Sequence, residues 1–426
     1  MNFHPKRIYL RLFLETVVLC ALALALNIRP APVSLDISML QDHLWEIHSI
    51  DPEGKSHSDL EFLKQELKDK QIVVLGESLH QDGSTFLAKT RLVKFLHREL
   101  DFNTLFFELG QYDLWRLQQD TALAPESAVY PFWCLSDQTQ QLWKYIKETG
   151  IETVGFDIQC TGNLKDTARR SMLFNYMSGF GIDAVQAWPE SYKFFQKIRG
   201  YFDHRSLSYA IKNSIIFPDK ITTELDSMVC FLNRQPMHDL SQSQQFELKT
   251  HLSYIAGIKN QLVYISKYEA GEPPRLQWRD SLMAENFLSL LNEPQYKDKK
   301  IIVWIANLHA FNDNRQFYNK SFENLGERVK AIYGEKMYTL LFTSFSRYNS
   351  GEKPYDLSRF NSLEYALHTL NKPYLYLTNM DLAVLNPVVC RVNQSAHYSV
   401  SLKNMADGLF YINATQNVSY ECNRNR

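Results

Sequence analysis

Residues 71–83 read QIVVLGESLHQDG, and this stretch decides the fold. Its first six residues form a β-branched apolar run, which predicts a short strand ending at Gly76, where a glycine permits a sharp turn. Glu77 and His80 follow where the apolar run stops. Because they are three residues apart, a turn or a helix start places them on one side, where a carboxylate can orient an imidazole as a general base near neutral pH. The structural alternative is a helix cap beside a histidine whose hydrogen bonds are satisfied.

Three further apolar runs, at 104–107, 152–156 and 301–306, end in the same way. The polar residues that follow them are Glu108, Asp157, Gln159, Asn307 and His309. In open α/β sheets, ligands bind outside the carboxyl ends of the strands. Polar groups at the ends of four runs therefore indicate one shared pocket, although any one of them alone could be a structural group bonded to backbone amides.

The segments between these runs predict an α/β fold. Residues 86–100 carry apolar side chains at helical spacing between two runs, which is the pattern of a βαβ unit and of a mainly parallel central sheet flanked by helices. Residues 35–48 also show helical spacing. Between about 185 and 290 no convincing strand occurs, so we expect a largely helical insertion over the carboxyl end of the sheet. The sheet resumes at residue 301, and the last fifty residues predict short strands and loops.

Composition limits the classes of function. The chain has 426 residues, of which 45% are hydrophobic and 22% charged, and its net charge is −1. That balance is typical of a globular body with one large or two smaller domains, and it creates no strong field that would attract nucleic acid. The sequence contains no G-x-S-x-G elbow, no P-loop and no complete dinucleotide motif. Without a P-loop or a complete dinucleotide motif, we expect no cofactor.

The N-terminus differs from the rest of the chain. Lys6, Arg7 and Arg11 precede an apolar stretch at 12–28, which is interrupted once by Glu15. Residues 1–29 are therefore interpreted as a cleaved signal peptide or an uncleaved membrane anchor, and both alternatives stay open. In either case the basic end stays inside, so we expect the body, residues 30–426, to be exported to the periplasm or the outside of the cell. The membrane would be contacted only through the N-terminal segment.

Export would also permit disulfides. Five cysteines lie beyond the N-terminal segment, and Cys390 and Cys422 near the C-terminus are the best candidate pair. The odd number leaves at least one free thiol. No C-x-x-C pair occurs, so a zinc ribbon is not expected.

Taken together, four blocks of the sequence resemble the erythromycin esterase family. They are GESLHQDG, TLFFE, WRDSLMAEN and IIVWIANLHAFND, which are similar to the family's G-E-x-x-H-G, apolar-run-to-Glu, R-D-x-x-M-A-x-N and strand-to-His blocks. They occur in the family order and span more than half of the chain. Two positions depart from the family pattern: Gln81 stands where Gly is usual, and Ala306 stands where a further His is frequent. These departures bear on the substrate more than on the chemistry.

The resemblance implies an α/β fold with a helical insertion and a metal-independent hydrolase. Carried over by matching position, His80 would be the general base that activates water for attack on an ester or lactone carbonyl, and Glu77 would orient His80. Glu108, Arg279 and His309 would stabilise the tetrahedral oxyanion and handle protons. Macrolide resistance is one role in the family, but the resemblance does not name the substrate.

Other roles and other functions remain open at this point. Asp157, Gln159, Asn307 and Asp82 are candidates for binding the substrate. The same His and Glu cluster could hold Zn²⁺ or Mn²⁺, which would make the protein a metallohydrolase. The third alternative is a non-catalytic exported protein whose pocket binds a macrocycle or another apolar ligand.

Overall fold

The computed structural model describes residues 44–54, 56–120, 123–162, 166–198, 204–267, 273–316, 323–349, 351, 353–385 and 387–420. The N-terminal segment 1–29 and Cys422 lie outside these ranges. The signal peptide or anchor and the Cys390–Cys422 pair therefore stay predictions. Within the described ranges, no helix is long and apolar enough to cross a membrane.

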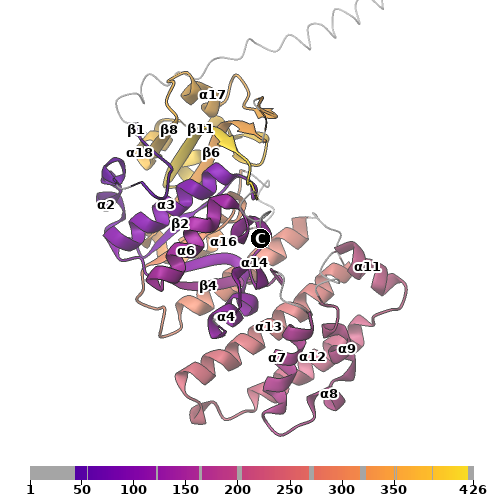
Figure 1. Ribbon diagram of the computed structural model, residues 1–426. Helices are drawn as coiled ribbons and strands as arrows, with labels where there is room; N and C mark the ends of the chain where they lie inside the picture. The colour runs from indigo at the N-terminus through magenta and orange to yellow at the C-terminus, as the bar shows by residue number, and fades with distance from the viewer. Residues whose placement is uncertain are drawn as a thin grey trace, which may run out of the picture.

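A mixed, mainly parallel sheet forms the centre of the molecule (Figure 1). The strands are β1 Trp45–Glu46, β2 Ile72–Leu75, β3 Thr104–Gly110, β4 Glu152–Asp157, β5 Ile301–Trp304, β6 Met337–Tyr348, β7 Asp356–Leu357, β8 Tyr374–Thr378, β9 Val388–Asn393, β10 Ala396–Val400 and β11 Gly408–Gln416. Nine of them form this sheet in the order β1-β8-β11-β6-β2-β5-β3-β4, with β7 paired to β6, whereas β9 and β10 pair antiparallel as a separate two-stranded sheet. The neighbours from β11 to β4 are parallel, whereas β8 and β1 are antiparallel at one edge. The predicted fold class is confirmed.

Helices follow most of the strands. They are α2 Phe62–Leu67, α3 Gly83–Leu100, α4 Gln111–Gln119, α5 Pro131–Cys134, α6 Gln140–Thr149, α7 Asp166–Ser178, α8 Ala184–Ala187, α9 Pro189–Phe195, α11 His204–Lys212, α12 Pro218–Asn233, α13 Gln242–Lys267, α14 Pro273–Leu291, α15 Asn307–Ala310, α16 Leu325–Tyr333, α17 Leu363–His368, α18 Asn379–Val384 and α19 Leu402–Met405. Asp82 caps α3, because its side chain accepts a hydrogen bond from the backbone N–H of Thr85.

Both faces of the sheet are covered, which explains why its strands are continuous apolar runs instead of alternating ones. On β2, Val73 and Leu75 belong to the core that contains the apolar side of α3. Ile72 and Val74 belong to the opposite core, which contains Phe287 of α14. A one-residue shift in register would therefore exchange two apolar surfaces, and β2 has no position for a polar side chain.

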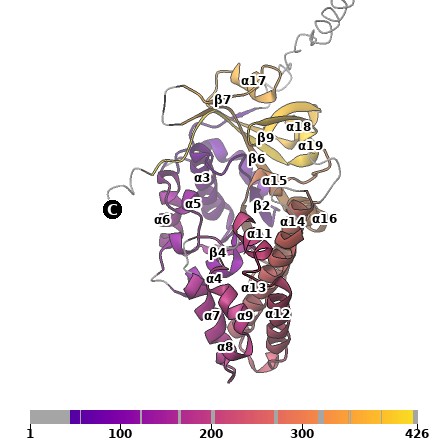
Figure 2. The ribbon, with the colours of Figure 1, turned by 90° about the vertical axis from the view of Figure 1, so that its right-hand side faces the viewer.

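The helices from α7 to α13 form a body with its own apolar core. Figures 1 and 2 show α7, α8, α9, α11, α12 and α13 grouped at one end of the molecule. Their core includes Leu225, Ile255 and Leu262, which are fully buried. The predicted helical segment of about 185–290 overlaps this body, which begins earlier, at Asp166, and ends with α13 at Lys267; the last part of the predicted segment is α14. The helix α14 returns the chain from this body to the sheet.

Two local predictions need correction. Within residues 35–48, Trp45–Glu46 is a strand paired with β8, and positions before 44 lie outside the described ranges. The last fifty residues contain more than short strands and loops. The nine-residue strand β11 lies inside the sheet, where Phe410 pairs with Phe342 on β6 and Tyr376 on β8. The alternation of aromatic and polar residues in this segment predicts short strands, but it does not predict which distant strands β11 pairs with.

Candidate functional site

The strand order brings the predicted polar residues to one edge of the sheet. β2, β5, β3 and β4 are consecutive neighbours and parallel, so their carboxyl ends lie together. Glu77 follows β2, Glu108 lies within β3, Asp157 ends β4, and His309 lies on α15 just after β5. Arg279 reaches the same edge from α14.

Arg279 lies on α14, and the packing of this helix against the sheet fixes its position. Arg279, Met283 and Phe287 are spaced four residues apart, so they lie along one side of α14. Met283 and Phe287 are buried against the sheet, and the ring of Phe287 meets that of Phe106 edge-on at 5.3 Å. The apolar residues therefore hold the helix in place, and the charged residue one turn earlier projects to the strand ends.

His80 and Glu77 form a directly bonded pair. The Nδ1 atom of His80 lies 2.8 Å from Oε1 of Glu77. Because an ionised carboxylate can only accept, Nδ1 carries the hydrogen and Nε2 of the neutral ring keeps its lone pair. The His80 side chain is 45% exposed, whereas Glu77 is 0% exposed. Phe132 stacks on the His80 ring at 5.4 Å, and Trp133 meets it edge-on at 5.5 Å.

The surroundings of His80 favour its charged form. Burial of part of the ring opposes the imidazolium, but the hydrogen bond to Glu77 and the charges of Glu108 and Glu77 outweigh it and raise the pKa of His80 above its ordinary 6.5. The positive charge of Arg279 works in the opposite direction. A histidine of this kind accepts a proton more readily than a free imidazole does.

Glu77 is bonded on both of its oxygens. Oε1 also accepts from Nε1 of Trp133 at 3.2 Å, and Oε2 accepts from Nζ of Lys89 at 2.7 Å. The side chains of Glu77 and Lys89 are both 0% exposed. Burial lowers the pKa of Lys89 to about 8, against the raising effect of Glu77.

A second group of side chains centres on Arg279. Its Nη2 lies 2.9 Å from Oε1 of Glu108 and 2.5 Å from Oδ2 of Asp157, and its Nε lies 3.3 Å from Oδ1 of Asp157. The other oxygen of Glu108 accepts from the backbone N–H of Ala306 at 2.8 Å. Burial alone would raise the pKa of Glu108, but the charges of His309, Arg279 and His80 hold it at about 2. Glu108 is thus a fixed negative charge.

His309 completes this group. Its Nδ1 lies 2.8 Å from Oδ1 of Asp280, and its Nε2 lies 3.2 Å from Nη1 of Arg279 and 3.4 Å from Oε1 of Glu108. Its side chain is only 5% exposed. Burial opposes its charged form, but the charges of Asp280 and Glu108 raise the pKa of His309. Each histidine of the site is therefore oriented by a carboxylate bonded to its Nδ1.

The side chains of Asn307 and Asp82 are buried and form hydrogen bonds with backbone groups. Nδ2 of Asn307 donates to the carbonyl oxygens of Phe342 at 2.8 Å and Val392 at 2.7 Å, and the residue is 0% exposed. A Cβ at position 76 would lie 2.1 Å from Oδ1 of Asn307, which explains the need for Gly76. Asp82 is 1% exposed and caps α3. We therefore propose structural roles for Asn307 and Asp82 in place of the predicted contacts with substrate.

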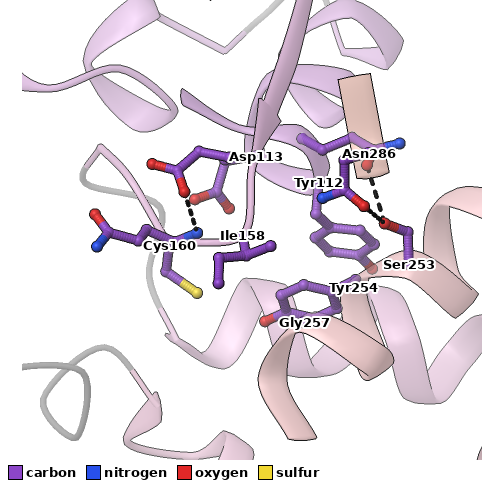
Figure 3. Close-up of a pocket in the computed structure, with 12 residues that line it drawn as sticks. Tyr112, Asp113, Ile158, Cys160, Ser253, Tyr254, Gly257 and Asn286 are labelled. Atoms are coloured by element: carbon purple, nitrogen blue, oxygen red, sulfur yellow. Dashed lines mark hydrogen bonds between the residues drawn. The ribbon is translucent and has the colours of Figure 1, made fainter. Parts of the chain in front are cut away.

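Asp157 and Gln159 lie beside a small hollow between the sheet and the helical body. Its lining includes Tyr254 and Cys160, which Figure 3 shows on opposite sides. The volume of about 10 Å³ accommodates about one water molecule. Oε1 of Gln159 accepts from the hydroxyl of Tyr130 at 3.0 Å. A larger hollow of about 580 Å³, lined in part by Trp115, lies between α4, α7 and α13. Neither hollow is lined by His80 or His309.

The predicted residues also contact side chains that the sequence did not single out, among them Lys89, Phe132, Trp133, Asp280 and Tyr130. One of them had a readable signal. Lys89 occupies the helix stripe of Phe86, Val93 and Leu96, where a lysine is buried only with a partner. Asp280 adjoins Arg279 in sequence, and that adjacency alone does not predict that Asp280 bonds His309.

The acids of the site are already paired with fixed cations. Lys89 occupies one oxygen of Glu77, and Arg279 bonds both Glu108 and Asp157. A divalent ion would have to displace these ammonium and guanidinium groups to use the same oxygens. In the described part of the chain, no group of three or more His, Cys, Asp and Glu residues is arranged to hold a metal ion.

Known proteins share this fold and sequence pattern. The sequence profile of the erythromycin esterase family matches residues 97–415. A Bacillus subtilis (strain 168) protein named "Putative hydrolase YbfO" is 26% identical over 379 residues, which is 80% of each chain. Two solved structures at 17% identity, a Bacillus cereus protein and a succinoglycan biosynthesis protein, superpose with TM-scores of 0.70 and 0.69 and cover 90% of this chain and 98% and 97% of their own. A mutant of the erythromycin esterase EreC in its open conformation has 16% identity and a TM-score of 0.64, with 86% and 96% covered.

Proposed function

Because the chain belongs to the erythromycin esterase family, we propose that it is a metal-independent hydrolase that cleaves an ester or a lactone with water activated by His80. The observation that carries this proposal is the asymmetry of the site. His80 is almost half exposed, whereas Glu77, Glu108 and His309 are buried and Arg279 is 18% exposed. A base that must meet water and substrate has to be accessible, and the groups that tune it are more effective when water is excluded.

In the proposed mechanism, Nε2 of His80 takes a proton from water as the water oxygen bonds to the carbonyl carbon. Glu77 stabilises the imidazolium through Nδ1. The carbonyl π electrons move onto oxygen, and the resulting oxyanion is stabilised by the positive groups of Arg279 and His309. When the intermediate collapses, the bond to the alkoxy oxygen breaks, and that oxygen receives a proton from a histidine. The products are a carboxylic acid and an alcohol, or a hydroxy acid from a lactone.

Glu108 and Asp157 have supporting roles in this proposal. They hold Arg279 from two neighbouring strands, so the guanidinium, whose Nη1 lies 3.2 Å from Nε2 of His309, keeps its position at the site without reorganisation. Asp280 does the same for His309. Gln159 lies within hydrogen-bond reach of Tyr130, at 3.0 Å, and we propose that this pair contacts polar groups of the substrate.

The test is a panel of esters and lactones, with erythromycin as one member because EreC is an erythromycin esterase. Purified protein is assayed before and after EDTA treatment, with metal content measured by elemental analysis. We expect turnover of at least one panel member, unchanged by EDTA. Activity lost with EDTA and restored by Zn²⁺ or Mn²⁺ would favour a metallohydrolase. Binding of a ligand without product would favour the non-catalytic alternative.

We further propose that the body acts outside the cytoplasm. Lys6, Arg7 and Arg11 precede the apolar stretch at 12–28, which supports an N-terminus that stays inside. A reporter that is active only in the periplasm, fused after residue 60, should be active. A signal only from a cytoplasmic reporter at that position would contradict export.

A further inference from the structure

We propose that Lys89 is a positioning residue for His80, because its buried ammonium shares the charge of Glu77 and so weakens the hold of Glu77 on the His80 proton. This inference rests on the proposed role of His80 as the base. Lys89 does not approach the reacting atoms in this scheme. It acts only through the carboxylate to which both it and His80 are bonded.

The contacts of Lys89 support this role. Its Nζ lies 2.7 Å from Oε2 of Glu77, 3.4 Å from the carbonyl oxygen of Ile305, and 4.1 Å from the ring centroid of Trp304. The side chain is 0% exposed, on a helix face where the neighbouring stripe positions are apolar. A lysine in such a place loses its hydration, so its charge is retained by Glu77, the carbonyl and the aromatic face.

The two oxygens of Glu77 bind different partners. Oε1 faces His80 and Trp133, and Oε2 faces Lys89. A carboxylate shared between two cationic partners attracts each of them less than it would attract one alone. With Lys89 charged, His80 can be oriented by Glu77 without being locked in its protonated state at neutral pH, where a general base must be free to accept a proton.

Other charged groups also change the pKa of His80, and the effect of Lys89 adds to theirs. Glu108 on β3 favours the imidazolium, and Arg279 on α14 disfavours it. The residues of α5 that contact the ring, Phe132 and Trp133, carry no charge. In this scheme Glu77 and Glu108 favour the protonated form of His80, and Arg279 and Lys89 disfavour it. Removal of Lys89 should therefore favour the imidazolium.

The experiment reads the protonation of His80 directly and needs no substrate. The protein is labelled with ¹³C at the histidine Cε1 position, the His80 signal is assigned by its loss in His80→Asn, and the signal is titrated by NMR. In Lys89→Met the pKa of His80 should rise by about one unit, which is the usual scale for a neighbouring charge within about 4–6 Å. In Lys89→Arg it should stay close to the wild-type value.

Lys94→Met is the matched control. Lys94 is a second buried lysine on α3, but its Nζ donates to the carbonyl oxygen of Pro52 at 3.0 Å. We expect Lys94→Met to leave the His80 titration unchanged. If Lys89→Met does not fold, Lys89→Gln replaces it: the amide can still bond Oε2 of Glu77 but carries no charge, so the pKa of His80 should again rise.

Two results would overturn the inference: an unchanged or lowered pKa of His80 in the folded uncharged variant, Lys89→Met or Lys89→Gln, or an equal shift in Lys94→Met. Activity supplies an independent readout. In Lys89→Met, kcat/KM should fall about tenfold at pH 7 and recover by pH 9, whereas a purely structural role would lower it at every pH. If the His80 pKa moves as expected but His80→Asn keeps full turnover, the proposed function fails and the role of Lys89 stands.

Discussion

Arg279 on α14 and Asp157 at the end of β4 form a two-point ion pair, with Nη2 2.5 Å from Oδ2 and Nε 3.3 Å from Oδ1. The same Nη2 also donates to Glu108 on the neighbouring strand β3. One guanidinium therefore ties the returning helix to the ends of two strands. A planar donor fork can do this, whereas the point charge of a lysine cannot.

We therefore expect Arg279→Met to lower the free energy of unfolding by about 3–5 kcal/mol, because buried Asp157 loses its ion-pair partner and buried Glu108 loses one of its cationic partners. Arg279→Lys should fall between the wild type and Arg279→Met. Urea unfolding followed by circular dichroism measures the change. Arg315→Met, which breaks the exposed pair with Asp313, is the control and should have little effect. Equal stability of Arg279→Met and the wild type would contradict the bridging role.

Gly76 and Asn307 should show strong coupling. Gly76→Ala places a methyl group on Oδ1 of Asn307, and Asn307→Ala removes two hydrogen bonds to backbone carbonyls, so each should cost about 1–3 kcal/mol of stability. In the double variant the clash is absent, and the two losses should not add. Chemical denaturation of the four proteins measures the coupling. Additive losses would show that the two residues act independently.

This pair also illustrates what the sequence could predict. The rule that ligands gather at the carboxyl ends of parallel strands placed Glu77, Glu108, Asp157 and His309 at one edge, because each follows an apolar run. The same rule included Asn307, whose position next to a strand end made it look accessible. An amide at that point can equally bond the backbone of strands that are distant in sequence, and local pattern gives no information about them.

The helical contributions were harder to predict. Arg279 was found through its block of sequence, but its contacts with Glu108 and Asp157 depend on how α14 packs after the whole helical body. Lys89 and Asp280 bond their partners through tertiary placement alone. Periodicity gives the face of a helix, and it does not say which strand end that face meets. For the same reason, the sequence predicted only short strands and loops in the last fifty residues, and not that β11 is the neighbour of β6.

The pH dependence of the free energy of unfolding should include a contribution from Glu108. Its folded pKa of about 2 lies below the ordinary 4.5, so its contribution is present above pH 4.5 and is lost as the pH falls toward 2. The shift corresponds to about 3 kcal/mol. Glu108→Gln should therefore show a flatter loss of stability in this window. An identical slope for Glu108→Gln and the wild type, measured by thermal unfolding from pH 5 to pH 2.5, would contradict the pairing.

Asp82 should show the opposite sign. Burial raises the pKa of Asp82 to about 6, although the N–H of Thr85 and the charge of Arg347 oppose it. An acid whose folded pKa is raised costs stability as the pH rises from 3.8 through 6. Asn keeps the capping bond and carries no charge, so Asp82→Asn should be more stable than the wild type at pH 7.5, by about 1–3 kcal/mol. Thermal unfolding at pH 4 and 7.5 measures this. A destabilised Asp82→Asn at pH 7.5, or a loss of substrate affinity with intact stability, would favour the substrate contact instead.

The most direct test of the central claim compares His80→Asn with His97→Asn on a panel substrate that the wild type hydrolyses. His97 is a matched control on α3, with its Nδ1 2.7 Å from the Tyr145 hydroxyl. Both proteins are first shown to be folded by circular dichroism, and kcat/KM is then measured at pH 8. The account predicts a loss of about 10²–10⁴-fold for His80→Asn, the usual contribution of a general base, and none for His97→Asn. Retained activity in folded His80→Asn would contradict it.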